Sequence, residues 1–217
     1  MSSNRVEFVA NLFSRKAPAQ LAPDSSVREI FQAFERVPAD PMLAERNANL
    51  VVDRLKTRHH FTLNAEDERG IRTLYRTFSR EGVQFFSSSF LSPGYAYLMT
   101  LTDGKGKNWS YLASKENYER IRLMQQQNLI VPLVGDFAGT KAIRAVGQYL
   151  KDHGATVHVF YISNVEDYIQ ARTRYVGNIA SLPTDASSVL LRWYIGGHTE
   201  INSIADFLRN QRGFNSR

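Results

Sequence analysis

The chain has 217 residues, of which 43% are hydrophobic, a composition that is ordinary for a packed globular protein and argues against extensive disorder. Its longest apolar runs, residues 129–134 and 156–162, are far shorter than the roughly 20 residues that a membrane-spanning helix needs. The absence of cysteine excludes disulfides and thiolate metal sites, and the first residues lack the apolar core of a signal peptide. We therefore expect a cytoplasmic protein with no membrane partner.

The positive charge raises the question of nucleic-acid binding, because the formal net charge is +6 and the pI is near 9.6. Between residues 53 and 81, basic side chains are mixed with aspartate and glutamate, as on a solvated helical face. No recognised nucleic-acid-binding motif accompanies the charge. Nucleic-acid binding is therefore disfavoured, but it stays an alternative.

The first 82 residues are predicted to form a helical region with proline-rich turns. Ser25 or Ser26 caps the second helix, and Asn64 opens the fourth. The expected helices lie at 6–15, from 27 to the breaking prolines at 38 and 41, at 43–55, and from 64 through 78.

Residues 83–217 are predicted to form an α/β region with a Rossmann-like sheet, continuous with the helical region in one domain. Its first part contains a loop or short irregular strand at 82–94, a strand at 95–102 and a turn at 103–106. Ser114 then caps a helix that runs to about Gln127.

A parallel strand–helix–strand unit is predicted between Asn128 and Tyr168. Apolar runs at 129–134 and 156–163 flank a helix whose apolar side chains recur with helical spacing between 142 and 150. One residue conflicts with this prediction, because Pro132 removes a backbone donor from the first strand, which is then short or irregular at its start. The region is completed by a short helix at 165–174, a third core strand at 187–195 and a closing helix at 200–210.

The loop after the first apolar run is the predicted ligand site, because open α/β sheets bind ligands beyond the carboxyl ends of their strands. It contains Gly135, Asp136, Phe137 and Gly139. Asp136 would accept hydrogen bonds from a ligand, or it caps the following helix, and the sequence favours neither role. Residues 135–141 differ from a Walker phosphate loop in glycine spacing and in the order of threonine and lysine.

Two further groups of polar residues are candidate binding residues. Asn108 and Tyr111 follow a glycine-containing segment that a hairpin turn explains. Ser163, Asn164 and Glu166 follow the second apolar run and would hold a ribose or an amine, but a simple helix start explains them better. No histidine has a partner at metal-ligand spacing, and no metal is expected.

Four segments carry a resemblance to known proteins: Asn11–Arg15, Tyr111–Ser114, 128–139 and 156–167. The most specific part is the sequence Val-Gly-Asp-Phe-Ala-Gly at 134–139. Together the segments resemble an uncharacterised family of bacterial proteins whose fold is similar to class I S-adenosylmethionine-dependent methyltransferases. The resemblance extends over most of the chain, to about Leu191.

This resemblance implies a methyltransferase-like domain that binds a small ligand near the 135–141 loop, with S-adenosylmethionine as cofactor. Longer members begin with a strand, a glycine-containing loop and a second strand ending in an acidic residue, and this chain is expected to lack that cofactor-binding part. If the chain is an enzyme, Asp136 would orient the methyl acceptor. The sequence Asp136-Phe137 lacks the Pro-Pro-aromatic pattern of amine-methylating enzymes, so no substrate follows from it.

Two functions of other classes stay open. Without its first strands, the predicted sheet has an exposed edge, which would pair with a partner chain or with a second copy in a homo-oligomer. The chain would then be a non-enzymatic interaction module. The other alternative is the nucleic-acid-associating role.

Overall fold

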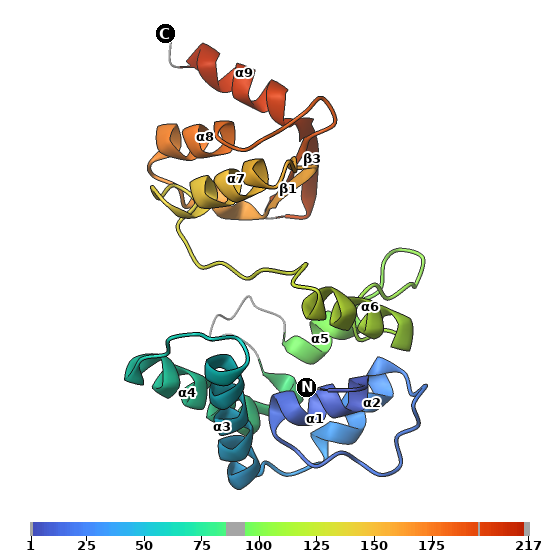
Figure 1. Ribbon diagram of the computed structural model, residues 1–217. Helices are drawn as coiled ribbons and strands as arrows, with labels where there is room; N and C mark the ends of the chain where they lie inside the picture. Colours follow the sequence, from blue (N-terminus) through green and yellow to red (C-terminus); the bar gives the residue numbers. More distant parts are fainter. Residues whose placement is uncertain (1, 86–93, 195, 215–217) are drawn as a thin grey trace. The chain divides into compact units, whose positions relative to one another are not determined.

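The computed structural model describes residues 2–85, 94–194 and 196–214. Residues 212–214 are described by their backbone alone. The chain divides into two compact units, Met1–Ile130 and Val131–Arg217, which are described separately. The first unit is helical, and the second combines helices with a small sheet (Figure 1).

The first unit is built from helices, most of which begin where the sequence signals a start. They are α1 (Arg5–Phe13), α2 (Val27–Glu35), α3 (Pro41–Thr57), α4 (Ala65–Glu81), α5 (Tyr95–Thr100) and α6 (Lys115–Gln126), with a 3-10 turn η1 (Gly82–Gln84) after α4. Ser26 and Asn64 each take part in a capping box, and the Ser114 side chain accepts a hydrogen bond from the Asn117 amide. The predicted caps at these three positions are confirmed.

The core of the first unit is formed by side chains of α1, α2, η1, α5 and α6. Val9, Phe13, Ile30 and Phe34 are at most 1% exposed, and Leu112, which precedes α6, is buried with them. Each such side chain contributes about 1.5–3 kcal/mol through its removal from water. The helices α3 and α4 pack against each other, and α4 also contacts α1.

A buried arginine fixes the position of α1. Arg5 is 4% exposed, and its Nη1 donates to the carbonyls of Leu112 and Ala113 at 3.0 and 3.4 Å. Its Nη2 donates to the carbonyls of Pro23 and Ser25 at 3.2 and 2.8 Å. The planar guanidinium suits this role because its donors point outward in fixed directions. Arg5 therefore joins α1 to the segments that precede α2 and α6.

The second unit contains a three-stranded mixed sheet. Its elements are α7 (Ala142–Asp152), β1 (Val159–Ile162), a 3-10 turn η2 (Asn164–Asp167), α8 (Arg172–Ala180), β2 (Val189–Tyr194), β3 (His198–Ser203) and α9 (Ile204–Phe214). The strand order is β1-β2-β3; β1 and β2 are parallel, with Val159 beside Val189. Strands β2 and β3 are antiparallel, and between them Gly196 and Gly197 have positive φ angles of 103° and 85°.

One face of this sheet is covered and the other is partly exposed. Ile162 and Leu190 pack with Tyr175 and Ile179 of α8 and with Phe207 of α9. The pleat sends alternate side chains to the opposite face. These outward side chains are 37–64% exposed: Val159, Tyr161, Trp193 and Ile201.

The prediction of a Rossmann-like sheet in the C-terminal half is wrong. Residues 129–134 form no strand, and Leu129, Val131, Leu133 and Val134 are at least 62% exposed. This run spans the boundary between the two compact units, where no strand pairs with it, and Pro132 has no amide to donate. The parallel crossover lies one step later, from β1 through α8 to β2.

Three other predicted elements also differ. The strand expected at 95–102 is the helix α5, in which the Thr100 hydroxyl donates to the Ala96 carbonyl. In place of the helix expected at 165–174, the structure has the 3-10 turn η2 and then the start of α8. In place of the helix expected at 200–210, it has the end of β3 and then α9. The strand expected at 187–195 is confirmed as β2. Residue 195 and most of the predicted 82–94 loop lie outside the described residues.

The helical region expected at 1–82 lies inside the first compact unit, which continues to Ile130. Among the helices that the structure describes, none combines the length and the apolarity that crossing a membrane requires.

We expect Arg5→Met to lower the free energy of unfolding by about 2–5 kcal/mol, because buried carbonyls would lose their donors. Urea denaturation followed by circular dichroism measures this change. Arg28→Met is the matched control, since Arg28 is an exposed arginine of α2. Equal stabilities of the two variants would contradict the role of Arg5.

Candidate functional site

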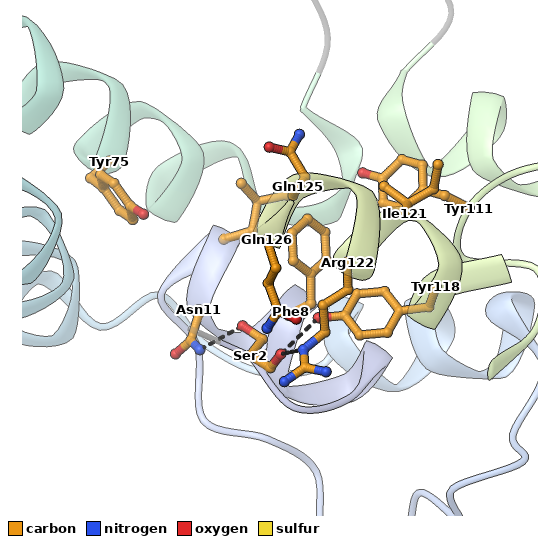
Figure 2. A pocket seen from close by; sticks show the side chains of 11 residues that line it. Ser2, Phe8, Asn11, Tyr75, Tyr111, Tyr118, Ile121, Arg122, Gln125 and Gln126 are labelled. Atoms are coloured by element: carbon orange, nitrogen blue, oxygen red, sulfur yellow. Dashed lines mark hydrogen bonds between the residues drawn. The ribbon is translucent and has the colours of Figure 1, made fainter. Parts of the chain in front are cut away.

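The first unit contains a cavity of about 580 Å³ between α1, α4 and α6. Figure 2 shows the side chains that surround it. They are Ser2, Phe8, Asn11, Leu12, Tyr75, Tyr111, Tyr118, Ile121, Arg122, Gln125 and Gln126. Cavities of about 300–1,000 Å³ with mainly apolar walls are typical of small-molecule sites.

Helical spacing brings these side chains to one place. Phe8, Asn11 and Leu12 stand at i, i+3 and i+4 on α1, so they share a face. Tyr118, Ile121, Arg122 and Gln125 follow the same spacing on α6. The cavity therefore lies between two helix faces that each combine apolar and polar side chains.

Aromatic rings form much of the wall. The ring of Phe8 lies 5.9 Å from that of Tyr111, edge to face, and 5.8 Å from that of Tyr118. The hydroxyl of Tyr111 is 2.6 Å from the hydroxyl of Tyr95. Burial raises the pKa of Tyr95, Tyr111 and Tyr118, so their phenols are neutral at physiological pH. The wall thus offers ring faces, ring edges and uncharged hydroxyl groups.

Polar groups converge on Ser2 at one side of the cavity. Its carbonyl oxygen accepts hydrogen bonds from the Tyr118 hydroxyl at 3.2 Å and from Nε of Arg122 at 3.1 Å. The Asn11 amide donates to the Ser2 hydroxyl at 3.0 Å. The dashed lines in Figure 2 mark these contacts. This side can hold an acceptor group, while the cavity wall as a whole is mainly apolar.

Of the predicted site residues, Tyr111 is the one that lines this cavity. Asn108 lies in the same unit, but its side chain donates to the Met99 carbonyl at 2.8 Å and accepts from the Ser110 amide at 2.8 Å. It therefore satisfies a carbonyl near the end of α5 and an amide in the segment that follows.

The predicted 135–141 loop lies in the second unit. The Asp136 carboxylate accepts from the Ala138 amide at 2.8 Å, and its carbonyl accepts from the Gly139 amide at 3.0 Å. This is the geometry of a turn stabilised by its first aspartate. Gly135, Asp136 and Phe137 also border a mainly apolar cavity of about 310 Å³ beside α7 and β1. Asp136 itself is exposed.

A buried asparagine that the sequence did not single out holds this loop. Asn178 of α8 is 0% exposed, and its amide nitrogen donates to the carbonyls of Phe137 and Gly139 at 2.9 and 2.7 Å. Its Oδ1 accepts from Nε of Arg144 at 2.8 Å. The available signal was a polar residue between the buried Tyr175 and Ile179 on a helical stripe.

The remaining predicted residues lie around η2. Ser163 and Asn164 are joined by a 3.4 Å hydrogen bond, and Asn164 donates to the Tyr168 hydroxyl at 3.4 Å. Glu166 instead lies 3.5 Å from Nη1 of Arg192. The structure therefore distributes the predicted site residues over separate places.

A charged cluster surrounds Arg192 on β2. Its Nη2 donates to Glu200 at 2.6 Å and to Asn202 at 2.7 Å, and the Tyr194 hydroxyl donates to Glu200 at 3.0 Å. Cross-strand pairing explains the contact between Arg192 and Glu200, because the two residues lie directly opposite each other on β2 and β3. Neither this cluster nor any other described group brings three or more His, Asp or Glu side chains into an arrangement that could hold a metal ion.

The described residues form a mainly helical protein with a small three-stranded mixed sheet, and its helical unit contains a cavity of small-molecule size. Residues 30–215 match the family model for a domain of unknown function (DUF7790), and the chain belongs to this family. The match begins within α2 and therefore leaves out α1. No curated protein matches the chain.

We expect Asp136→Ala to lower the free energy of unfolding by about 1 kcal/mol, because the Ala138 amide loses its acceptor. Asp136→Asn retains a side-chain oxygen and should stay close to the original stability. Urea denaturation measures both changes, and hydrogen exchange at the Ala138 amide reports the turn directly. An unchanged exchange rate in Asp136→Ala would show that the carboxylate does not stabilise the turn.

Proposed function

We propose that the protein binds a small, mainly apolar, ring-containing molecule in the cavity between α1, α4 and α6. The observation that carries this proposal is the 580 Å³ volume, bordered mainly by aromatic and aliphatic side chains with a few polar groups among them. The proposal concerns binding, and it assigns no catalytic step to these residues.

The aromatic wall supports a ligand with a ring. Of the residues that line the cavity, Phe8, Tyr75, Tyr111 and Tyr118 are aromatic. A planar ligand ring between such side chains gains edge-to-face or offset contacts of about 0.5–1.5 kcal/mol each beyond the burial of its surface. Tyr75 adds a phenol on the α4 side of the cavity, where burial raises its pKa and keeps it neutral.

The neutral dye N-phenyl-1-naphthylamine tests the proposal, because its fluorescence rises in an apolar site. We expect saturable binding by the full chain. Ile121→Trp should weaken binding at least about tenfold, because the larger side chain fills part of the cavity. Leu123→Trp is the matched control on the same helix, since Leu123 is 52% exposed and does not line the cavity.

Thermal unfolding of both tryptophan variants shows whether they remain folded. Equal dye affinity in the two variants would contradict binding in this cavity, and so would the absence of saturable binding to the original chain.

S-adenosylmethionine binding near residues 135–141 remains a separate proposal from the sequence resemblance. The place at which it is tested is the cavity of about 310 Å³ beside Gly135, Asp136 and Phe137. Under this proposal, calorimetric titration gives a saturable heat, which Asp136→Ala reduces. No heat at millimolar S-adenosylmethionine would overturn it.

A protein-interaction role is supported by the sheet of the second unit. Among the described strands β1 pairs only with β2, so its other edge offers unpaired main-chain groups. Sedimentation at several protein concentrations tests self-association at this edge.

Titration with duplex and single-stranded nucleic acid at two salt concentrations tests the nucleic-acid alternative.

A further inference from the structure

The cavity of the first unit has a guanidinium in its wall that pairs with no carboxylate in the described part of the chain. Arg122 is partly buried, and its Nε donates to the Ser2 carbonyl at 3.1 Å. The salt bridges between described residues do not include it. A partly buried charge without an oppositely charged partner is costly, so this position favours an anion.

One carboxylate that the charge of Arg122 influences is Glu7. Its carboxylate accepts hydrogen bonds from the amide and the hydroxyl of Ser3, both at 2.6 Å. These bonds are the main reason why the pKa of Glu7 is lowered, and the charge of Arg122 contributes less. Both Ser3 bonds go to Oε2 of Glu7, and within the described residues Glu7 forms neither a hydrogen bond nor a salt bridge with Arg122.

Two donors already converge on one oxygen at this position. The Tyr118 hydroxyl and Nε of Arg122 both donate to the Ser2 carbonyl, at 3.2 and 3.1 Å. An oxyanion is a stronger acceptor than a peptide carbonyl, and the two Nη groups of an arginine add further donors. An anionic oxygen of a ligand can thus replace or join the Ser2 carbonyl.

We propose that the ligand of this cavity is an apolar, ring-containing acid whose carboxylate, or a comparable oxyanion, is bound by Arg122 and Tyr118. The ring then lies against Phe8 and Ile121, which line the same cavity. This inference rests on the proposed function, and it adds the chemical class of the ligand.

Two dyes with the same ring system separate the two proposals. N-phenyl-1-naphthylamine is neutral, and 8-anilino-1-naphthalenesulfonate carries one oxyanion on the same skeleton. We expect the original chain to bind the anionic dye about tenfold more tightly than the neutral one, as one charge-assisted interaction allows.

Substitution of the guanidinium should remove this preference. In Arg122→Gln, the affinity for the anionic dye should fall about tenfold, while that for the neutral dye should change less than about twofold. Arg122→Lys should retain part of the preference, because it keeps the charge and loses the planar donors. Arg120→Gln is the matched control, since Arg120 is an exposed arginine of α6 that does not line the cavity.

The outcomes are distinguishable. If both dyes bind with equal affinity and Ile121→Trp weakens the binding of both, the cavity binds ligands but the proposal of an acidic ligand is wrong. If Ile121→Trp affects neither dye, the proposed function fails as well. Should Arg122→Gln not fold, the comparison of the two dyes on the original chain still decides, because equal affinities overturn the proposal.

Discussion

The hydrogen bonds of Arg5 to four main-chain carbonyls are the contact on which the first unit depends. Through Leu112 and Ala113 they hold the segment before α6 against α1, and through Pro23 and Ser25 they hold the entry to α2. The helix α6 begins directly after that segment, and its Tyr118 also packs against Phe8 of α1. A buried arginine that does not line the cavity thus helps to hold two of the helices that border it.

A single buried polar side chain has a similar role in the second unit. Asn178 joins α8 to the turn at 136–139 through two carbonyls, and Arg144 of α7 completes its hydrogen bonding. Such a side chain satisfies partly buried loop carbonyls, and its own buried amide makes its loss costly. Both units thus combine an apolar core with one polar residue that fixes a connection.

The candidate site was only partly visible in the sequence. Tyr111 was singled out, and Tyr118, Ile121 and Arg122 share a face of a helix whose cap at Ser114 is readable. Phe8 and Tyr75 come from helices that are distant in the chain, and no local pattern shows that they meet. The apolar run at 129–134 misled the prediction because composition indicates strand propensity but not the presence of a pairing partner.

What the sequence determined by itself was local: Ser26, Asn64 and Ser114 begin helices because their side chains satisfy amides within three residues. It also determined membership of a family through residues 30–215. Tertiary structure alone decided that residues 95–100 are helical, that β1 pairs with β2, and that Arg122 lies beside an apolar cavity. These outcomes depend on contacts between residues far apart in the chain, whose free energies outweigh the small local preferences of either segment.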